Sequence, residues 1–294
     1  MKRRIGAVAA VAIAAAALLG GAAPDAGSQL LCSAAIGGMA YVPAGKVLYG
    51  EDGTGRPGQK IDVPAFWIDR EEVTNHQFAA FAEATGYVTT AEHEGGSAVF
   101  ISPGKWNGDY DPSQWWRFVK GASWRHPQGP DSDIVGKDWL PVVHVTYEDA
   151  LAYARWAGRE LPDAVQWERA ARSDQDAPHD PYRWAYNADG KPIANSWQGV
   201  FPAVDTASDG YAGIAPVGCF PGNAFGIHDM IGNVWEWTSG AAGADGRERL
   251  LKGGSFLCAF NYCQNFRAAA FQAQERDLGA SHIGFRTISR SPPA

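Results

Sequence analysis

The chain has 294 residues, of which 46% are hydrophobic and 19% are charged, and its formal net charge is -7. That hydrophobic content excludes an intrinsically disordered chain, and the length is sufficient for one large domain with a full core. The acidic balance offers no basic surface for nucleic acid or anionic lipid, so we expect no nucleic-acid partner.

Residues 1–28 have the pattern of an export signal peptide. Three basic residues at positions 2–4 precede the apolar run Ile5–Ala23, which ends in small residues. We expect cleavage near the end of this run, before residue 29, and no stable membrane insertion afterwards. The alternative is an uncleaved anchor, because the run approaches the length that spans a bilayer. The mature chain is therefore expected to be periplasmic or secreted.

The first predicted elements are two short strands and a helix. Apolar residues bounded by Gly and Pro predict strands at 39–45 and 66–69. Thr74 and Gln77 have the spacing of a capping box, which predicts a helix over about 75–85. A glycine directly after that segment suits the helix end.

The middle of the chain alternates irregular and helical segments. Residues 102–138 are rich in Trp, Gly, Pro and Asp and show no periodicity, which predicts a long loop held by aromatic packing. A helix is expected over 146–158, and another begins after Asp163, with Gln166 completing its capping box. From Ser173 onward the pattern predicts mostly loops and short strands.

These elements predict one domain. No linker, repeat or low-complexity stretch divides the chain, so we expect a single domain at 38–289 and a short tail at 290–294. The expected fold class is α+β and irregular, with few helices, short strands and many loops.

Cys258 and Cys263 are the most informative pair of residues in the sequence. Neither a helix nor a strand brings together side chains five positions apart, so the thiols meet only if 259–262 fold back as a turn. Gly253 and Gly254 would permit the close backbone approach beside that turn. Three fates stay open: a structural disulfide, a redox-active thiol pair, and a two-thiolate site for a soft ion such as copper(I). Zinc is disfavoured, because no second clustered pair is present.

Other cysteines and arginines give weaker indications. Cys32 and Cys219 are isolated in sequence, and an oxidising compartment would allow them to pair. Arg267 and Arg286 are expected to bind carboxylates or carbonyls of the protein itself.

Five motifs occur in an order and spacing that is specific to one family. They are YVPAG at 41–45, WIDREEVTN at 67–75, RELPDAVQWE at 159–168, GNVWEW at 232–237 and GFR at 284–286. Together they resemble the formylglycine-generating enzyme, or sulfatase-modifying factor, family. The resemblance covers about residues 38–289 and implies that family's irregular fold, which is related to C-type lectins. Because such folds carry several functions, the site must decide the activity.

The segment GGSFLCAFNYC at 253–263 matches the family's active-site pattern Gly-Gly-Ser-x-x-Cys-x4-Cys. The resemblance implies that Cys258 and Cys263 bind copper(I), and that Ser255 lies beside the metal and positions substrate or oxygen. The alternative for Ser255 is a simple hydrogen bond within a turn. The implied activity is a copper-dependent oxidase that converts a cysteine in a target polypeptide, such as a sulfatase, to formylglycine. It would consume oxygen and an external thiol reductant.

Four positions depart from the family pattern. Ala259 and Asn261 replace a usual His and Ser, Phe271 stands where Arg is usual, and His282 stands where Asn is frequent. Phe271 favours a second hypothesis, an oxidase of the same fold that acts on an exported small molecule such as a siderophore precursor. A third hypothesis is a non-enzymatic, lectin-like binding module in which the cysteines form a disulfide.

The resemblance also implies two structural calcium sites, in loops that alternate side-chain and carbonyl oxygens as calcium requires. The first would use side-chain oxygens of Asn and Asp with two carbonyls, and the second would use two carboxylates with two carbonyls. The first set is Asn195, Ser196, Asp209 and Tyr211, and the second set is Asp229, Gly232, Val234 and Glu236.

Overall fold

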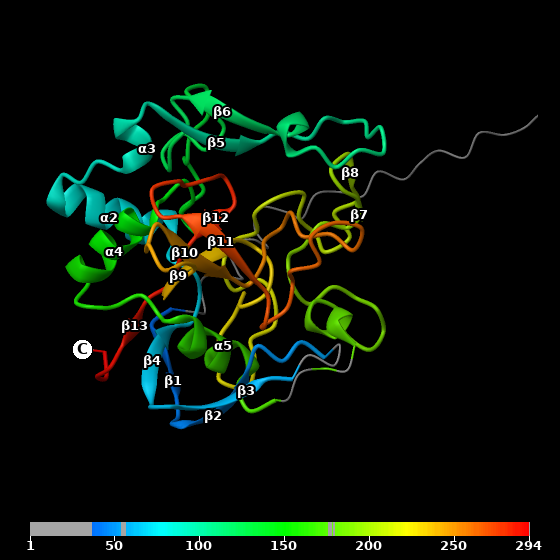
Figure 1. Cartoon of the computed structure of the whole chain (residues 1–294). Coiled ribbons are helices and arrows are strands. Elements are labelled where there is room, and N and C mark those ends of the chain that lie inside the picture. Colours follow the sequence, from blue (N-terminus) through cyan, green and yellow to red (C-terminus); the bar gives the residue numbers. More distant parts are fainter. Residues whose placement is uncertain (1–36, 54–56, 176–177, 179, 294) are drawn as a thin grey trace, which may run out of the picture.

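The computed structural model describes residues 37–53, 57–175, 178 and 180–293. The expected export segment and Cys32 lie outside these residues. The described chain forms short strands and few helices, connected by long loops (Figure 1). The irregular α+β class expected from the sequence is confirmed.

Two sheets organise the strands. The three-stranded sheet has the order β1 (Met39–Val42), β4 (Phe66–Asp69) and β13 (Ile288–Ser289). The four-stranded sheet has the order β11 (Phe271–Glu275), β10 (Glu248–Lys252), β9 (Trp235–Ala241) and β12 (Ile283–Gly284). All pairs in both sheets are antiparallel except β12 with β9. The four-stranded sheet is central in Figure 1, and its strand β10 ends directly before the cysteine segment 253–263.

Three two-stranded ladders lie outside the sheets. They are β2 (Gly45–Tyr49) with β3 (Gln59–Val63), β5 (Gly96–Phe100) with β6 (Trp116–Lys120), and β7 (Gly199–Val200) with β8 (Val204–Asp205). Because β6 lies within 102–138, the prediction of an unbroken loop there is wrong. The strand shows no strict alternation of buried and exposed residues, so its pairing with β5 left no period-2 pattern in the sequence.

Three of the four α-helices among the described residues begin where capping residues predicted them, and the helix Thr90–His93 and the two 3-10 turns were not predicted. The helices are α2 (Asn75–Thr85), α3 (Thr90–His93), α4 (Tyr147–Trp156) and α5 (Ala164–Arg172), with 3-10 turns η1 (Pro112–Gln114) and η2 (Pro181–Trp184). Capping boxes at Thr74, Thr146 and Asp163 are all formed, which confirms those three predictions. No helix in the described part of the chain is long and apolar enough to cross a lipid bilayer.

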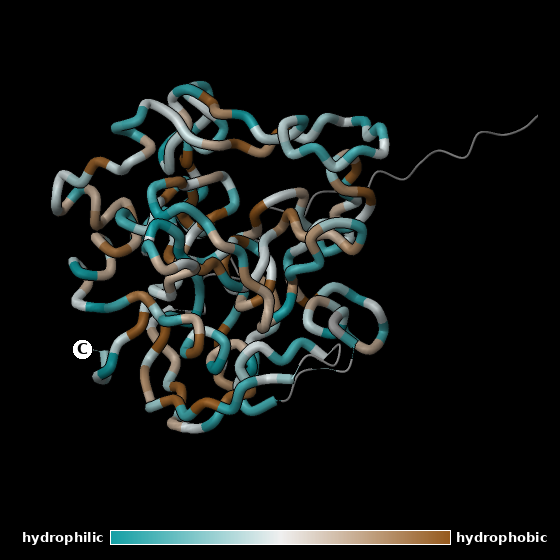
Figure 2. The backbone as a smooth tube through the Cα atoms, in the orientation of Figure 1, coloured by the Kyte–Doolittle hydropathy of each residue, from teal (hydrophilic) through white to brown (hydrophobic). Residues whose placement is uncertain are grey.

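The main core lies between the helices and the sheets. Its largest fully buried side chains include Trp124, Trp167, Trp235 and Trp237, and Phe78 of α2 packs edge-on against Trp124. Figure 2 shows that many hydrophobic stretches run through the interior, while strongly hydrophilic stretches follow outer loops. Aromatic burial of this extent compensates for the small amount of regular hydrogen-bonded structure.

A second, smaller cluster supports the segment that carries the cysteines. It consists of Trp115, Trp197, Phe201, Leu257 and Ala259. Two of these residues come from the cysteine segment itself, and the others come from distant loops. The cluster therefore holds the cysteine segment against these loops by apolar packing.

A buried charge network anchors β10 directly before the cysteine segment. The carboxylate of Glu168 on α5 accepts hydrogen bonds from Lys252 Nζ at 3.0 Å and from Arg172 at 2.7 and 2.9 Å. The Gly50 N–H donates to the same carboxylate at 2.8 Å. Glu168 and Lys252 are fully buried, so the Lys252 ammonium is compensated by Glu168, whose carboxylate also pairs with Arg172.

Candidate active site

Cys258 and Cys263 meet because the chain between them reverses. Ala259 and Tyr262 exchange backbone hydrogen bonds of 2.9 and 3.1 Å, so the turn expected at 259–262 is formed. The two Sγ atoms are 2.8 Å apart, and both thiols are free. A disulfide would require about 2.05 Å. The pair is thus held in contact without being joined.

The two preceding glycines permit this geometry. Gly253 and Gly254 have φ angles of 95° and 78°, in the left-handed region that other residues avoid. A Cβ at Gly254 would lie 2.8 Å from the carbonyl oxygen of Asn265, and one at Gly253 would lie 3.0 Å from that of Met230. The close approach predicted for this glycine pair is therefore confirmed.

The two thiols have opposite tendencies to ionise. The hydrogen bond from Cys258, with help from Asn265 and the charge of Arg267, lowers the pKa of Cys263 against the effect of burial. Burial, followed by the neighbouring sulfur, raises the pKa of Cys258 well above its ordinary value. Cys263 is therefore the thiol of the pair that ionises more readily, and Cys258 is the one that keeps its proton more strongly.

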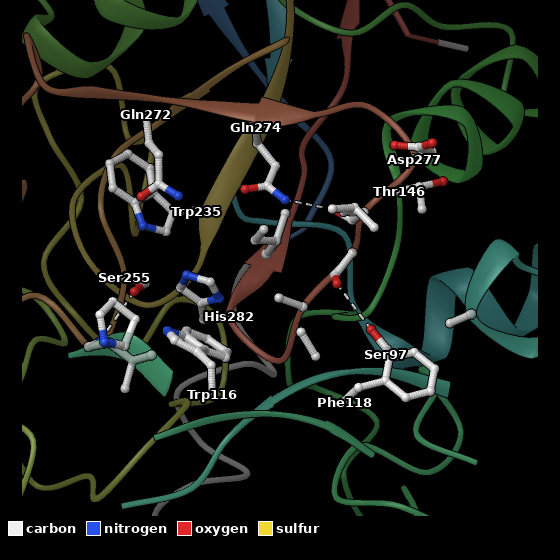
Figure 3. Close-up of a pocket in the computed structure, with 18 of the residues that line it drawn as sticks. Ser97, Trp116, Phe118, Thr146, Trp235, Ser255, Gln272, Gln274, Asp277 and His282 are labelled. Atoms are coloured by element: carbon white, nitrogen blue, oxygen red, sulfur yellow. Dashed lines mark hydrogen bonds between the residues drawn. The ribbon is translucent and has the colours of Figure 1, made fainter. Parts of the chain in front are cut away.

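The sulfur pair opens into a cavity of about 870 Å³. Its walls come from the β5–β6 hairpin, from β11 and from the turn that precedes β12 (Figure 3). Ligand sites commonly measure about 300–1,000 Å³, so this cavity is near the upper end. The combination of a reactive thiol pair with such a cavity marks this place as the candidate active site.

Polar side chains line the cavity beside the sulfurs. Ser255 is fully buried, and its hydroxyl accepts a hydrogen bond from the Leu257 N–H at 3.3 Å, which is the turn contact considered as its alternative role. It also lines the cavity, as do His282, Gln272 and Gln274. Figure 3 shows the two glutamines projecting from β11 on the opposite side of the cavity from Trp116 and Phe118.

The departures from the family pattern lie mostly away from the cavity. Phe271 does not line it, because Gln272 and Gln274 occupy the cavity face of β11 and Phe271 is on the other face. Ala259 is buried in the smaller aromatic cluster. Asn261 ties the turn to a neighbouring loop, since its amide donates to Tyr110 Oη at 2.9 Å. His282 is the one changed residue that contacts the cavity directly.

The first proposed calcium loop is assembled around Asp209. Its carboxylate accepts from the Ser196 N–H at 3.1 Å and from the Tyr211 N–H at 2.9 Å, so three of the four residues converge. Asn195 contributes a buried Oδ1 that has no hydrogen-bond partner among the described residues. The Gln198 amide donates to Asp209 at 2.9 Å and also to the Ser196 carbonyl. A loop rich in oxygen atoms, in which the buried Asn195 Oδ1 has no hydrogen-bond partner among the described residues, suits a hard cation.

In the second proposed calcium loop, the carboxylate of Glu236 is less available to a cation than expected. Its carboxylate accepts two hydrogen bonds of 2.7 Å from Arg286 and one of 2.7 Å from Trp167. Burial raises the pKa of Asp229 to about 6, and Asp229 accepts from the Gly218 N–H at 2.5 Å. Arg286 thus binds a carboxylate, as expected from the sequence.

Glu72 is a residue that the sequence reasoning missed. Both of its carboxylate oxygens are buried without a hydrogen-bond partner among the described residues. Burial and the charge of Asp229 raise its pKa well above the ordinary value. A buried carboxylate beside Asp229 is what a cation would neutralise. Glu72 lies within the WIDREEVTN motif, which gave no indication of its role.

The two proposed calcium loops contact each other and the cysteine segment. The Asn233 N–H donates to the Asn195 carbonyl at 2.9 Å, and the Gly232 N–H donates to Gly253 at 2.9 Å. A Cβ at Gly232 would lie 2.0 Å from the Asn195 carbonyl oxygen, so only glycine fits. Within the described ranges, no three His, Cys, Asp or Glu side chains converge as a ready metal cluster. Any calcium site here depends on carbonyl ligands as well.

The fold and the site define a thiol-pair protein of the sulfatase-modifying type. The sulfatase-modifying factor enzyme 1-like domain family matches residues 29–291, and the chain belongs to this family. The chain is 41% identical over 280 residues to a formylglycine-generating enzyme of Thermomonospora curvata, covering 85% of this chain and 92% of that protein. It is 43% identical over 272 residues to one of Mycobacterium tuberculosis, covering 79% and 90%.

Membership alone does not decide activity. The chain is also 38% identical over 266 residues to the inactive Cα-formylglycine-generating enzyme 2 of Mus musculus, covering 85% of each chain. Among solved structures, PvdO from Pseudomonas aeruginosa matches with a TM-score of 0.60 and 24% identity, covering 86% of this chain and 94% of that one. The latter similarity supports the fold. The active-site residues must carry the functional conclusion.

Proposed function

We propose that this protein is an exported, copper-dependent oxidase that converts a cysteine of a target polypeptide to formylglycine. The observation that carries the proposal is the free Cys258 and Cys263 pair, with Sγ atoms 2.8 Å apart at the wall of a large cavity. The relatives named formylglycine-generating enzymes support the reaction type. Export is proposed from the basic and apolar pattern of residues 1–28.

Cys258 and Cys263 are the residues that would hold copper(I). They fit a soft monovalent ion, because one sulfur is already disposed to be a thiolate and the other releases its shared proton on binding. When bound, copper(I) supplies a site for the substrate sulfur and for the reduction of oxygen. The turn and the aromatic cluster beneath it keep both sulfurs at the cavity wall throughout.

The overall reaction must balance electrons as well as atoms. Loss of two electrons and two protons from the Cβ–S unit of the substrate cysteine gives a thioaldehyde, which water converts to the aldehyde and hydrogen sulfide. Oxygen accepts four electrons to form two waters. The remaining two electrons come from two external thiols, which become a disulfide. An external thiol reductant is therefore part of the proposal.

The cavity provides the surroundings that this reaction requires. Ser255 is fully buried beside the sulfur pair and is fixed by the Leu257 N–H, so its hydroxyl hydrogen remains available to position substrate or oxygen. Trp116 and Trp235 also line the cavity and give it apolar surface.

Calcium is proposed as the structural cofactor. Asn195, Ser196, Asp209 and Tyr211 would hold one ion, and Asp229, Gly232, Val234 and Glu236 would hold a second. Glu72 adds negative charge near Asp229. The buried, partnerless oxygens of Asn195 and Glu72 support these sites. Since the loops contact Gly253, an ion would stabilise the cysteine segment as well as its own loop.

The alternative hypotheses have less support. Phe271, which favoured a small-molecule substrate, does not line the cavity. A lectin-like module requires Cys258 and Cys263 to be locked in a disulfide, and thiol titration after mild reduction, with and without copper(I), separates it from both enzyme hypotheses. The polypeptide hypothesis therefore remains the better one.

The test is oxidation of a peptide containing Cys-x-Pro-x-Arg by the mature protein with copper(I), oxygen and a thiol reductant. We expect the aldehyde, identified by its mass and by capture with a hydrazide. Cys258→Ser and Cys263→Ser should each abolish it. Cys219→Ser is the control, because Cys219 does not line the cavity, and it should retain activity. Aldehyde formation by either active-site variant would refute the proposal.

A further inference from the structure

His282 lines the cavity and has a buried ring nitrogen without a hydrogen-bond partner among the described residues. It is 8% exposed and precedes β12, and its carbonyl accepts from the Trp235 N–H at 2.9 Å, which fixes the backbone. The imidazole lies against the Trp116 ring, with centroids 4.7 Å apart. Its position is therefore determined on two sides before any ligand binds.

The imidazole lacks a hydrogen-bond partner where one would be expected. Nδ1 of His282 is buried and makes no hydrogen bond within the described part of the chain. A buried polar atom without a partner is destabilising, and native proteins retain such atoms mainly where a ligand or an ion uses them. In Figure 3 the ring faces the space between Ser255 and the strand that carries Gln272.

The imidazole is suited to a neutral partner. Burial, with a contribution from His144, lowers the pKa of His282 to about 3, so the ring is uncharged at neutral pH. A neutral imidazole offers one N–H donor and one acceptor nitrogen. Among the described residues it does not form a three-ligand cluster with the two cysteines, so the structure gives it no place as a third metal ligand.

The matching ligand group is a peptide amide. An extended polypeptide presents an N–H and a C=O at each residue, and both are neutral groups that a fixed imidazole can bind. Gln272 and Gln274 face the same cavity from alternate positions of β11 and provide further neutral donors and acceptors. This wall of the cavity therefore offers hydrogen bonds to main chain rather than charge to a side chain.

We propose that His282 is a substrate-binding residue that hydrogen-bonds the main-chain amide next to the target cysteine and so positions that cysteine against the sulfur pair. The inference rests on the proposed function, and it adds the side-chain contact that selects a polypeptide substrate. The contact needs no proton transfer and no metal.

The test uses an unreactive peptide in which Ser replaces the target Cys, and it measures binding by fluorescence anisotropy. His282→Phe keeps a ring against Trp116 but removes both hydrogen-bonding atoms, and it should weaken binding roughly tenfold. His282→Asn keeps a donor and an acceptor, and it should stay within about threefold of the wild type. Phe271→Ala, on the outer face of β11, is the matched control and should bind as the wild type does.

Two further readouts separate this role from a merely structural one. The first readout is copper(I) affinity, measured by chelator competition, which should be unchanged in both His282→Asn and His282→Phe. The melting temperature should also be unchanged in His282→Asn. With the reactive peptide, His282→Phe should raise KM more than it lowers kcat. Equal peptide binding by His282→Phe and wild type would overturn this inference while leaving peptide oxidation intact. Absence of binding and of oxidation in the wild type would instead refute the proposed function, and this inference with it.

Discussion

Removal of the Glu168 charge should test how the protein holds the strand that leads into the cysteine segment. Glu168→Gln keeps the shape of the side chain but removes the anion that compensates Lys252 and Arg172. Lys252 is fully buried, and its remaining neighbours include the rings of Tyr49 and Trp167, each 5.6 Å from Nζ. Such rings replace only part of a carboxylate's stabilisation.

The magnitude follows from the burial of the pair. Breaking a buried ion pair by removing one partner costs about 3–5 kcal/mol, which for a protein of this size lowers the melting temperature by roughly 6–20 °C. Lys252→Met should lower the free energy of unfolding by less than half of that amount, because Glu168 still forms its ion pair with Arg172 and the buried Lys252 charge is removed. The double variant should be more stable than the sum of the single effects predicts, since the buried ammonium that Glu168 compensates is then absent.

The assay is thermal and urea unfolding of the four proteins in the same buffer. A Glu168→Gln variant within about 1 kcal/mol of the wild type would refute this reasoning. Simple additivity of the two substitutions would refute it as well, because it would mean that the buried charges do not depend on each other.

Three further predictions concern the site and its loops. Cys263 should react with iodoacetamide at least roughly tenfold faster than Cys258 at neutral pH, and equal labelling of both thiols would contradict this. In Cys258→Ser the pH midpoint of the Cys263 reaction should rise, because the hydrogen bond that lowers the pKa of Cys263 is weakened. Burial raises the pKa of Asp229 from 3.8 to about 6, so in the metal-free protein its contribution to stability is present below pH 3.8 and is lost as the pH rises through 6. Calcium competes with that proton, so added calcium should raise the melting temperature more at about pH 7.5 than at about pH 5, and an equal effect at both would exclude Asp229 as a ligand. Phe271→Arg should leave the KM for the peptide within about twofold, because residue 271 is outside the cavity, whereas a larger change would place this side chain in the groove.

The elements that the sequence predicted well are those with local causes. The helix starts at Thr74, Thr146 and Asp163 depend on side chains three residues apart, and all three capping boxes are formed. The cysteine turn was also predictable, because two thiols five positions apart can meet in only one way.

The features that were missed depend on contacts between distant segments. The pairing of β6 with β5 leaves no alternating pattern, so 102–138 looked like a loop. Glu72 and His282 differ from ordinary buried residues only in lacking hydrogen-bond partners, and this property appears only once the chain is folded. Similarly, the outward direction of Phe271 follows from the side of β11 that faces the cavity.

The central claim is that Cys258 and Cys263 are two unjoined thiols available to a metal and a substrate. The most direct test is to determine how many sulfur atoms bind a copper ion added to the protein. The reduced protein should take up one copper(I) per chain, with an X-ray absorption spectrum that shows two sulfur ligands, and should lose that uptake in either serine variant. A wild-type protein that keeps both sulfurs in a disulfide under mild reduction, or that binds copper(I) equally well without Cys263, would contradict the account.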